Sequence, residues 1–491
     1  MKVFYNIFHK KEYLYFFALF VIFFLAIFLR CNAFLSLRPL WHDECSLALS
    51  IIYKNTFDYF TSLLHSQSAP PLFMIISKFM TNIFGVSEFS LRLFPFICGI
   101  LSVFTFYVFT KMFIKNKFVI LFSNLLFALN FYVIYYSQEF KQYSTDVFFC
   151  LFLFILVNKI NLKDLTYIKA ILYSVLFSIF PFISIPTFFI ITSYFIYELL
   201  KNKNYMQALL FFFIPFIAFI CYMIFVLFPQ KEILSSFIIW NNGYIDFNFK
   251  HLMIFLKNNF SYFFYPNKLI LFQIILLFLG IYYLFKNINK KEYFLLTFLL
   301  LLIIFSSILH IYPVYQRLAL YLIPFSTITM LLFIDIKFQN KNLFLKLISI
   351  CLMILSFGYY FTPNSIKTLL NLPSIQNNDS RKLMEVLKEK YNLADYVAIN
   401  SSSDSDFYFY AYLNEFNPKK IFSIGITKIN DETNYINQLN KLPKGKYWFY
   451  YSYDNSNTPV IKYLEKWKIQ KENKVLYELK VKNSLLLYLE H

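Results

Sequence analysis

The sequence predicts an α-helical polytopic membrane protein with a C-terminal α/β domain. Of its 491 residues, 59% are hydrophobic, which exceeds the roughly one half that is usual in soluble domains. Apolar runs long enough to cross a bilayer alternate with short lysine-containing segments up to about residue 361. Beyond that point, helix and strand patterns alternate. We therefore divide the chain into a transmembrane domain, 1–361, and an α/β domain, 362–491.

The charge and the cysteines exclude several other classes of protein. The net charge is +19, but the lysines lie mostly between apolar runs or in the C-terminal part, without a nucleic-acid-binding motif. We expect the partner to be a lipid bilayer and not a nucleic acid. The six cysteines form neither a disulfide framework nor a paired-cysteine metal motif.

The transmembrane domain is expected to contain about eleven spans. Lysines precede the first apolar run, 13–29, and no small-residue cleavage site follows it, so we interpret it as a retained anchor. The region 166–200 has basic ends and carries Pro181 and Pro186 in its middle, which predicts two short helices hinged at the prolines. The other spans are expected near 91–112, 118–136, 144–158, 206–228, 268–286, 292–310, 315–335 and 343–361.

Lysine placement predicts the orientation in the membrane. Five short basic segments fall on the same side as the N-terminus, which the positive-inside rule assigns to the cytoplasm. The loop 31–90 and the C-terminal domain then lie outside. For a bacterial cell this means a multi-pass protein of the inner membrane with a periplasmic C-terminal domain.

The C-terminal domain shows regular alternation of helix and strand signals, which favours a mostly parallel sheet. A glycine-rich phosphate loop is absent, since the chain has only seven glycines. We expect this domain to have a structural or acceptor-binding role. Helices are predicted at 381–391, 406–415, 433–441 and 459–467, and strands at 396–400, 420–424, 446–451, 475–481 and 484–489.

A polar segment, Arg38–Glu44, follows the first span and contains two adjacent carboxylates, Asp43 and Glu44. Charges near hydrocarbon are costly, so they usually face water, a partner or a substrate. The alternative is an ordinary solvated loop. Downstream of this segment, 45–54 has an apolar face at helical spacing, which predicts a helix lying on the membrane.

Four motifs occur in order on the side predicted to be outside. They are Trp41–Glu44, then Pro70–Leu72 ahead of Phe84–Arg92, then Tyr136–Tyr143, and finally Arg317–Pro324. This order resembles the GT-C membrane glycosyltransferases, in particular dolichyl-phosphate-mannose protein mannosyltransferases and bacterial lipid A aminoarabinose or galacturonic acid transferases. The resemblance implies a polyprenyl-phosphate-sugar donor and an envelope glycoconjugate acceptor, which is a lipid, a glycan or a protein.

Within this resemblance, Asp43 matches the loop aspartate of the family and would be the general base for the acceptor hydroxyl. Glu44 would be an alternate base or would orient the sugar. Lys141 and Arg317 would clamp the donor phosphate, Arg317 through two parallel hydrogen bonds and Lys141 as a point charge. The alternatives are a helix cap for Asp43 and lipid-headgroup anchors for both cations.

Three further side chains are candidates for substrate binding: Glu139, His65 and Arg92. Glu139 is a candidate partner of Lys141, although two residues of spacing would not place them on one helical face. Arg92 is otherwise a headgroup anchor. The aminoarabinose-type enzymes carry a Glu-Lys pair before their proline, whereas 67–69 is neutral here, which argues against that donor and leaves His65 as a polar substitute.

No cofactor is expected, because no further ligand set flanks the two carboxylates to support a divalent cation. Two other functions share these features: a transporter or flippase of lipid-linked saccharides, and a polysaccharide ligase or polymerase. Transporters are usually built from repeats, and none is evident in this sequence. The paired acids and the C-terminal domain favour an enzyme.

Overall fold

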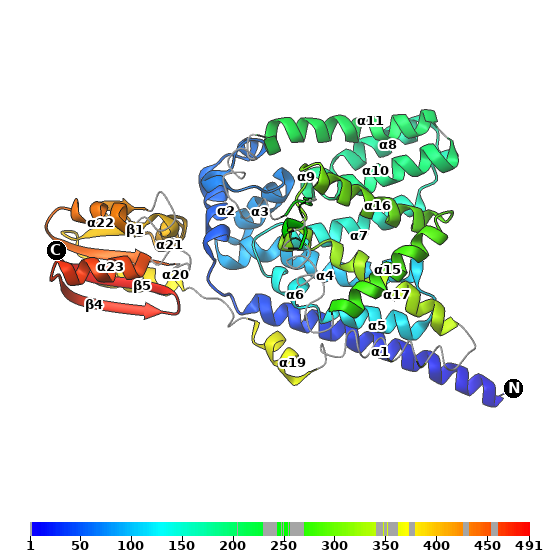
Figure 1. Cartoon of the computed structure of the whole chain (residues 1–491), viewed down its shortest axis with the longest axis horizontal. Helices are drawn as coiled ribbons and strands as arrows, with labels where there is room; N and C mark the ends of the chain where they lie inside the picture. Colours follow the sequence, from blue (N-terminus) through cyan, green and yellow to red (C-terminus); the bar gives the residue numbers. More distant parts are fainter. Residues whose placement is uncertain are drawn as a thin grey trace.

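The computed structural model describes residues 2–203, 205–228, 243–246, 248, 250–253, 255, 270–339, 347, 351, 362–372, 379–425, 432–452 and 460–491. It has a helical part and an α/β domain at one end of it (Figure 1). Helix α1, Lys2–Leu35, runs along one side of the helical part, from the N-terminus toward the end where the α/β domain lies.

The helical part is that of a polytopic membrane protein, as predicted. By length and composition, five described helices can cross a membrane: Glu12–Leu35 in α1, Glu88–Phe113 (α4), Tyr205–Leu227 (α11 and η5), Lys291–Ile308 (α16) and Leu322–Gln339 (α17). Shorter apolar helices accompany them at Pro71–Phe84 (α3), Lys117–Ala128 (α5), Tyr167–Ile183 (α8 and α9) and Phe272–Lys286 (in α15, Ile270–Lys286). The span predicted at 343–361 lies outside the described residues, apart from 347 and 351.

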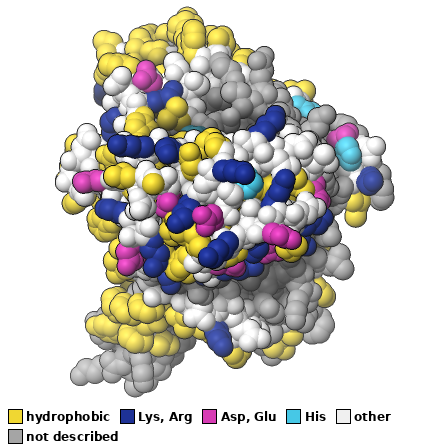
Figure 2. Space-filling model, turned by 90° about the vertical axis from the view of Figure 1, so that its left-hand side faces the viewer, with side chains coloured by type: hydrophobic (Ala, Val, Ile, Leu, Met, Phe, Trp, Pro, Cys, Tyr) yellow, Lys and Arg dark blue, Asp and Glu magenta, His cyan; other side chains and the backbone are white. Residues whose placement is uncertain are grey.

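Large apolar side chains remain exposed on these helices, which is expected of a surface in contact with lipid. On α1 they include Tyr13, Leu14, Phe16, Phe17, Phe20 and Phe24. The outer face of the α/β domain differs, because Lys and Arg side chains are interspersed there with Asp and Glu (Figure 2). The two parts thus present surfaces suited to lipid and to water.

Prolines and polar caps divide the predicted helices. The hairpin predicted at 166–200 consists of α8, Tyr167–Ser178, α9, Phe180–Ile183, and α10, Thr187–Tyr197, with Pro186 directly before α10. The helix predicted at 118–136 is instead two helices, α5 and α6, Phe131–Tyr136. It breaks because the Asn130 side chain accepts a hydrogen bond from the Val133 N–H and caps α6.

Helices α4 and α7, Tyr143–Lys159, pack closely and position two of the candidate segments. Gly99 of α4 lies against α7 and the residues before it, since a Cβ on Gly99 would come within 2.6 Å of the Ser137 Cβ. Small residues allow such close approach of membrane helices. This contact fixes Arg92 on α4 relative to the connection 137–142, which precedes α7.

The α/β domain has the predicted elements. Its helices are α20, Ser380–Lys390, α21, Asp404–Leu413, α22, Glu432–Asn440, and α23, Val460–Gln470. Its strands are β1, Tyr396–Asn400, β2, Ile421–Ile424, β3, Lys446–Tyr451, β4, Lys474–Val481, and β5, Ser484–Glu490, in the order β2-β1-β3-β5-β4.

The prediction of a mostly parallel sheet is wrong for one half of it. Strand β1 pairs in parallel with β2 and β3, but β5 is antiparallel to both β3 and β4. Only Lys482 and Asn483 connect β4 to β5, and a connection that short joins only antiparallel strands. The sheet is therefore mixed.

Helix α2, His42–Tyr53, lies between the helical part and the α/β domain. Leu47 and Ile51, the apolar face predicted to lie on the membrane, are buried in one hydrophobic cluster with Phe407 and Tyr410 of α21. That prediction is wrong because this face is buried inside the protein and not in contact with lipid, while α21 of the α/β domain contacts another face of α2 through Ser405 and Ser46. The first turn of α2, which carries Asp43 and Glu44, is thus held from both sides.

Candidate active site at the start of α2

The first turn of α2 places two adjacent carboxylates in different surroundings. The Glu44 side chain turns back and accepts a hydrogen bond from the Trp41 N–H at 3.3 Å, which caps the helix. Acidic residues in a first turn are also favoured by the helix dipole. Asp43 and Glu44 are successive helical residues and point about 100° apart. Glu44 therefore faces the protein interior, whereas Asp43 is partly exposed.

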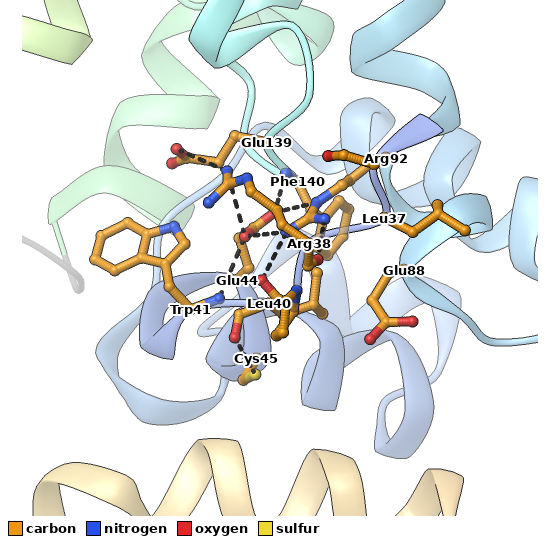
Figure 3. Close-up of polar contacts among 12 residues, drawn as sticks. Leu37, Arg38, Leu40, Trp41, Glu44, Cys45, Glu88, Arg92, Glu139 and Phe140 are labelled. Carbon is orange, nitrogen blue, oxygen red and sulfur yellow. Dashed lines mark hydrogen bonds and ion pairs between the residues drawn. The ribbon is translucent and has the colours of Figure 1, made fainter. Parts of the chain in front are cut away.

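Glu44 is fully buried and joins three segments of the chain (Figure 3). Arg92 donates to both of its oxygens, Nε to Oε1 at 2.8 Å and Nη2 to Oε2 at 2.6 Å. The Phe140 N–H also donates to Oε1, at 2.6 Å. Burial by itself would raise the pKa of Glu44, but the charges of Arg92 and Arg38 hold that pKa below its ordinary value. Glu44 therefore has the environment of a structural residue that holds Arg92 and the Phe140 backbone in place.

Arg92 is also committed to this network and does not reach a lipid headgroup. Its Nη1 donates to the Arg38 carbonyl at 2.6 Å and its Nη2 lies 3.3 Å from the Pro39 carbonyl. The side chain is 1% exposed. The interpretation of Arg92 as an interfacial anchor is therefore wrong, because α2 and the Arg38–Pro39 backbone cover it.

Glu139 lies beside this network. The Arg38 guanidinium is 3.8 Å from Glu44 and 3.7 Å from Glu139, and it stacks over the Tyr135 ring. Burial, together with the charge of Glu44, raises the pKa of Glu139 to about 7 against the opposing charge of Arg38. The described contacts pair Glu139 with Arg38 and not with the side chain of Lys141, because the turn at 137–142 directs the two side chains to different neighbours.

Asp43 is the carboxylate on the accessible side. Its Oδ2 accepts a hydrogen bond from Arg317 Nη2 at 2.9 Å, and both side chains are 23% exposed. The Arg317 guanidinium also lies over the Trp41 ring, 5.0 Å from its centroid, and within 5.8 Å of the Tyr143 ring. Burial alone would raise the pKa of Asp43, but Lys141 and Arg317 hold it below its ordinary value. Asp43 is thus ionised at neutral pH and able to accept a proton.

Lys141 brings a second cation to Asp43. Its side chain is 3% exposed, and Nζ donates to Gln67 Oε1 in the loop before Pro70. Burial lowers the pKa of Lys141, while the charge of Asp43 opposes this. The Lys141 side chain thus contacts the loop in which the sequence lacks the Glu-Lys pair of the aminoarabinose-type enzymes.

His65 is turned away from this group of charges. It lies in η2, Leu64–Ser66, with φ of 51°, and its Nδ1 is 3.7 Å from Asp404 Oδ2 of the α/β domain. Its described partner is thus Asp404 and not Asp43. The structure brings together Asp43, Lys141 and Arg317, places Glu44, Arg92 and Glu139 in the buried layer beneath them, and leaves His65 at the domain interface.

Three side chains with buried polar atoms come from the motifs Trp41–Glu44 and Tyr136–Tyr143, and two of them, Trp41 and Gln138, are not among the candidate residues. Trp41 Nε1, Glu139 Oε1 and the side-chain amide of Gln138 are buried and have no hydrogen-bond partner among the described residues. Such groups are rare in native proteins, where most buried polar groups have a hydrogen-bond partner. The motifs contain these residues, but the sequence does not show that their polar atoms are buried, because burial depends on which segments pack together. Among the described residues, no cluster of three or more His, Cys, Asp and Glu side chains is suited to a metal ion.

Comparisons with known proteins agree with the predicted fold. No family model and no curated protein sequence matches the chain. Its structure is similar to the crystal structure of ArnT from Cupriavidus metallidurans bound to undecaprenyl phosphate, with a TM-score of 0.53, 10% identity, and coverage of 96% of this chain and 97% of that one. The same protein in the apo state gives a TM-score of 0.52, 10% identity and 98% coverage of both chains. At this identity the likeness is one of fold, and the fold is GT-C-like.

Proposed function

We propose that this protein is a glycosyltransferase that moves a sugar from a polyprenyl-phosphate-linked donor to an acceptor hydroxyl of the cell envelope. The observation that carries the proposal is the position of Asp43, an ionised and accessible carboxylate beside two cations, Lys141 and Arg317. The fold shared with ArnT bound to undecaprenyl phosphate supports the choice of donor. The acceptor hydroxyl belongs to a lipid, a glycan or a protein, and the proposal does not name the sugar.

The three side chains match the demands of this reaction. The acceptor oxygen attacks the anomeric carbon, and the bond from that carbon to the phosphate oxygen breaks. The polyprenyl phosphate leaves with the electron pair, so little general-acid help is needed, and cations stabilise its charge. Arg317 presents a planar fork to the phosphate and Lys141 a point charge. The acceptor proton passes to Asp43.

The same contacts suggest how donor binding would change the basicity of Asp43. In the structure Arg317 donates to Asp43. A donor phosphate that competes for the Arg317 guanidinium would weaken this contact when the donor binds. Asp43 would then be a stronger base in the complex than in the free protein.

Two other functions remain as alternatives. Carriers usually bind their cargo near the bilayer midplane between repeats, whereas this group of charges lies at the start of α2, next to the α/β domain. A ligase or polymerase that transfers whole lipid-linked glycans would use the same chemistry, so it differs from our proposal only in the size of the donor.

The proposed location is the bacterial inner membrane, with the N-terminus in the cytoplasm and the α/β domain in the periplasm. Lysine-containing segments on one side of the predicted spans support this orientation. Donor and acceptor would then meet on the outer face of the membrane, where envelope glycoconjugates are found.

The test combines a strain that lacks the protein with the purified chain. Mass spectrometry of envelope glycans should show the loss of one sugar substituent, restored by the wild-type gene and not by Asp43→Asn. The purified protein in detergent should bind undecaprenyl phosphate and transfer labelled sugar from a lipid extract of the deletion strain. Because detergent leaves no compartments to transport between, sugar transfer there excludes a carrier. Unchanged glycans and no transfer would contradict the proposal.

A further inference from the structure

The α/β domain contacts the first turn of α2 and the start of α4 through helix α21. The Leu40 N–H donates to the Tyr410 hydroxyl at 2.7 Å, and this hydroxyl donates to Glu88 Oε1 at 3.0 Å. The Ser46 and Ser405 hydroxyls are 2.8 Å apart. These contacts come from the opposite side of α2 to Arg92, so the first turn of α2 is fixed between the two domains.

A buried carboxylate of the α/β domain points at this turn. Asp406 is fully buried, and its Oδ2 accepts hydrogen bonds from Ser380 Oγ at 3.1 Å and Ser452 Oγ at 2.5 Å. Its Oδ1 is 3.6 Å from His42 Nδ1. Neither of these two atoms has a hydrogen-bond partner elsewhere among the described residues, and the Cys45 thiol of α2 also lies against Asp406.

Charge balance assigns the protonation state of His42. A buried carboxylate is costly unless a cation pairs with it, and His42 is the cation that Asp406 faces. Burial would lower the pKa of His42, but Asp406 outweighs this and raises it, with smaller contributions from Asp43 and Asp404. The titratable neighbours of Asp406 in α2 and β3, Cys45 and Tyr450, stay neutral because burial raises the pKa of each.

From this geometry we propose that Asp406 is a positioning residue for Asp43 that acts through His42. The α/β domain would then contribute to the active site by orienting its base. This inference rests on the proposed function. His42 directly precedes Asp43 in the first turn of α2. An ion pair at His42 fixes the direction of that turn, and with it the approach of Asp43 to Arg317 and the acceptor.

A second contact of α21 reaches the other side of the site. Asp404 lies 3.7 Å from His65, and Gln67, two residues further along the same loop, accepts the hydrogen bond from Lys141. The first turn of α21 thus contacts both the turn that carries Asp43 and the loop that holds Lys141. A domain added only to bind an acceptor would not need either contact.

The decisive variant is Asp406→Asn, which keeps the size of the side chain and removes its charge. Sugar transfer from the labelled lipid extract is measured from pH 5 to 10, together with the KM for that donor. We expect kcat to fall about tenfold, because small displacements of a catalytic group are costly, with KM changed less than about twofold. The alkaline limb of the pH profile should move to lower pH by at least ~0.5 unit, because His42 loses the partner that raises its pKa.

The acid limb should stay in place, because His42 is protonated there in both proteins. A merely structural role would lower activity without moving the alkaline limb. Asp395→Asn is the matched control: Asp395 is a buried carboxylate of the same domain that accepts hydrogen bonds from Trp448 and Tyr488, within that domain. It should keep the pH profile of the wild type.

His42→Arg provides a second test if Asp406→Asn does not fold. Arginine keeps its charge at every pH used, so the alkaline limb should move to higher pH, up to the limit set by Lys141. The inference would be overturned if every folded variant among Asp406→Asn and His42→Arg had the pH profile of the wild type. It would also be overturned if Asp395→Asn showed the same shift as Asp406→Asn. Absence of sugar transfer by the wild-type protein would instead contradict the proposed function, so the two failures are distinguishable.

Discussion

At the scale of single residues, the candidate site depends on a division of roles between neighbouring carboxylates. Asp43 is partly exposed beside Arg317 and Lys141, whereas Glu44 is buried with Arg92 and the Phe140 N–H. The two side chains have similar chemistry. Their different directions from the helix make Asp43 the candidate base and Glu44 a structural partner of Arg92. Each role predicts a different consequence of substitution.

Asp43→Asn is expected to leave a folded but nearly inactive protein. The amide keeps the size of the side chain and can still hydrogen-bond, but it cannot take the proton of the acceptor. A general base typically contributes about 100- to 10,000-fold to rate. Sugar transfer by variants matched for thermal stability measures the effect, and a residual rate above about a tenth of the wild type would contradict the assignment of Asp43 as base.

Arg317→Lys is expected to weaken donor binding more than folding. A lysine keeps the positive charge near Asp43 but replaces the planar fork by a point charge. We expect the affinity for undecaprenyl phosphate to fall about tenfold, equivalent to ~1.4 kcal/mol, measured by native mass spectrometry. Arg381→Lys is the control, since Arg381 pairs with Glu88 at the domain interface. Equal affinities of Arg317→Lys and the wild type would make Arg317 an interfacial anchor.

Glu139 should make stability depend on pH. Its pKa is about 7 in the folded protein, above the ordinary value of 4.5, so the folded state binds the proton more tightly than the unfolded state does. The stability that this proton provides is complete below pH 4.5 and is lost as the pH rises toward 7. Glu139→Gln should remove this slope, seen as a flatter dependence of the unfolding midpoint between pH 4.5 and 8. The exposed Glu415→Gln should keep the slope, and identical slopes in all three proteins would contradict this prediction.

At the scale of elements, α2 and α4 are joined through buried charges and not through apolar packing alone. Arg92 sits one turn into α4 and reaches Glu44 in the first turn of α2, and the backbone N–H of Phe140 completes the contact. One carboxylate thus fixes two helices and the connection before α7. Its loss should affect the fold before it affects the chemistry.

Glu44→Gln is therefore expected to destabilise the protein more than it changes its catalytic step. Removing one partner of a buried ion pair costs about 3 to 5 kcal/mol, so the thermal unfolding midpoint in detergent should fall by at least ~5 °C. Glu432→Gln is a matched control, because Glu432 pairs with Lys466 on the surface, where such pairs contribute about 0 to 1 kcal/mol. A stable but inactive Glu44→Gln would return Glu44 to the list of candidate bases.

At the scale of the whole molecule, the α/β domain is docked on the same end of the helical part as the candidate site. One hydrophobic cluster contains residues of α2, α3, α21 and the sheet. Arg381 adds an ion pair to Glu88 at 2.9 Å. Where this domain lies relative to the membrane therefore also decides on which face the proposed reaction takes place.

Labelling of single cysteines tests this orientation. With the native cysteines replaced, Lys444→Cys in the α/β domain should react with an impermeant maleimide in intact spheroplasts, because lysine placement puts this domain outside. Lys115→Cys, between α4 and α5, should react only after lysis. Both positions are exposed in the structure. Protection of Lys444→Cys in intact spheroplasts would contradict the proposed orientation and the outer-face reaction.

The sequence by itself determined the class of the protein and much of its secondary structure. Hydropathy and lysine spacing predict a polytopic membrane protein, and local periodicity predicts the helices and strands from Arg381 to Leu489 closely. Both signals are short-range, since they depend on neighbouring residues along the chain. The motif order likewise singled out Asp43, Lys141 and Arg317, which the structure brings together.

Only the tertiary structure decided what each of these side chains contacts. Arg317 reaches Asp43 across 274 residues of sequence, and Arg92 reaches Glu44 across 48. The partner of His42, Asp406, belongs to the other domain. Burial and charge pairing depend on which segments meet in space, and no local pattern carries that information. For this reason the sequence could name the carboxylates, whereas only the packing of α2 between two domains separated Asp43 from Glu44.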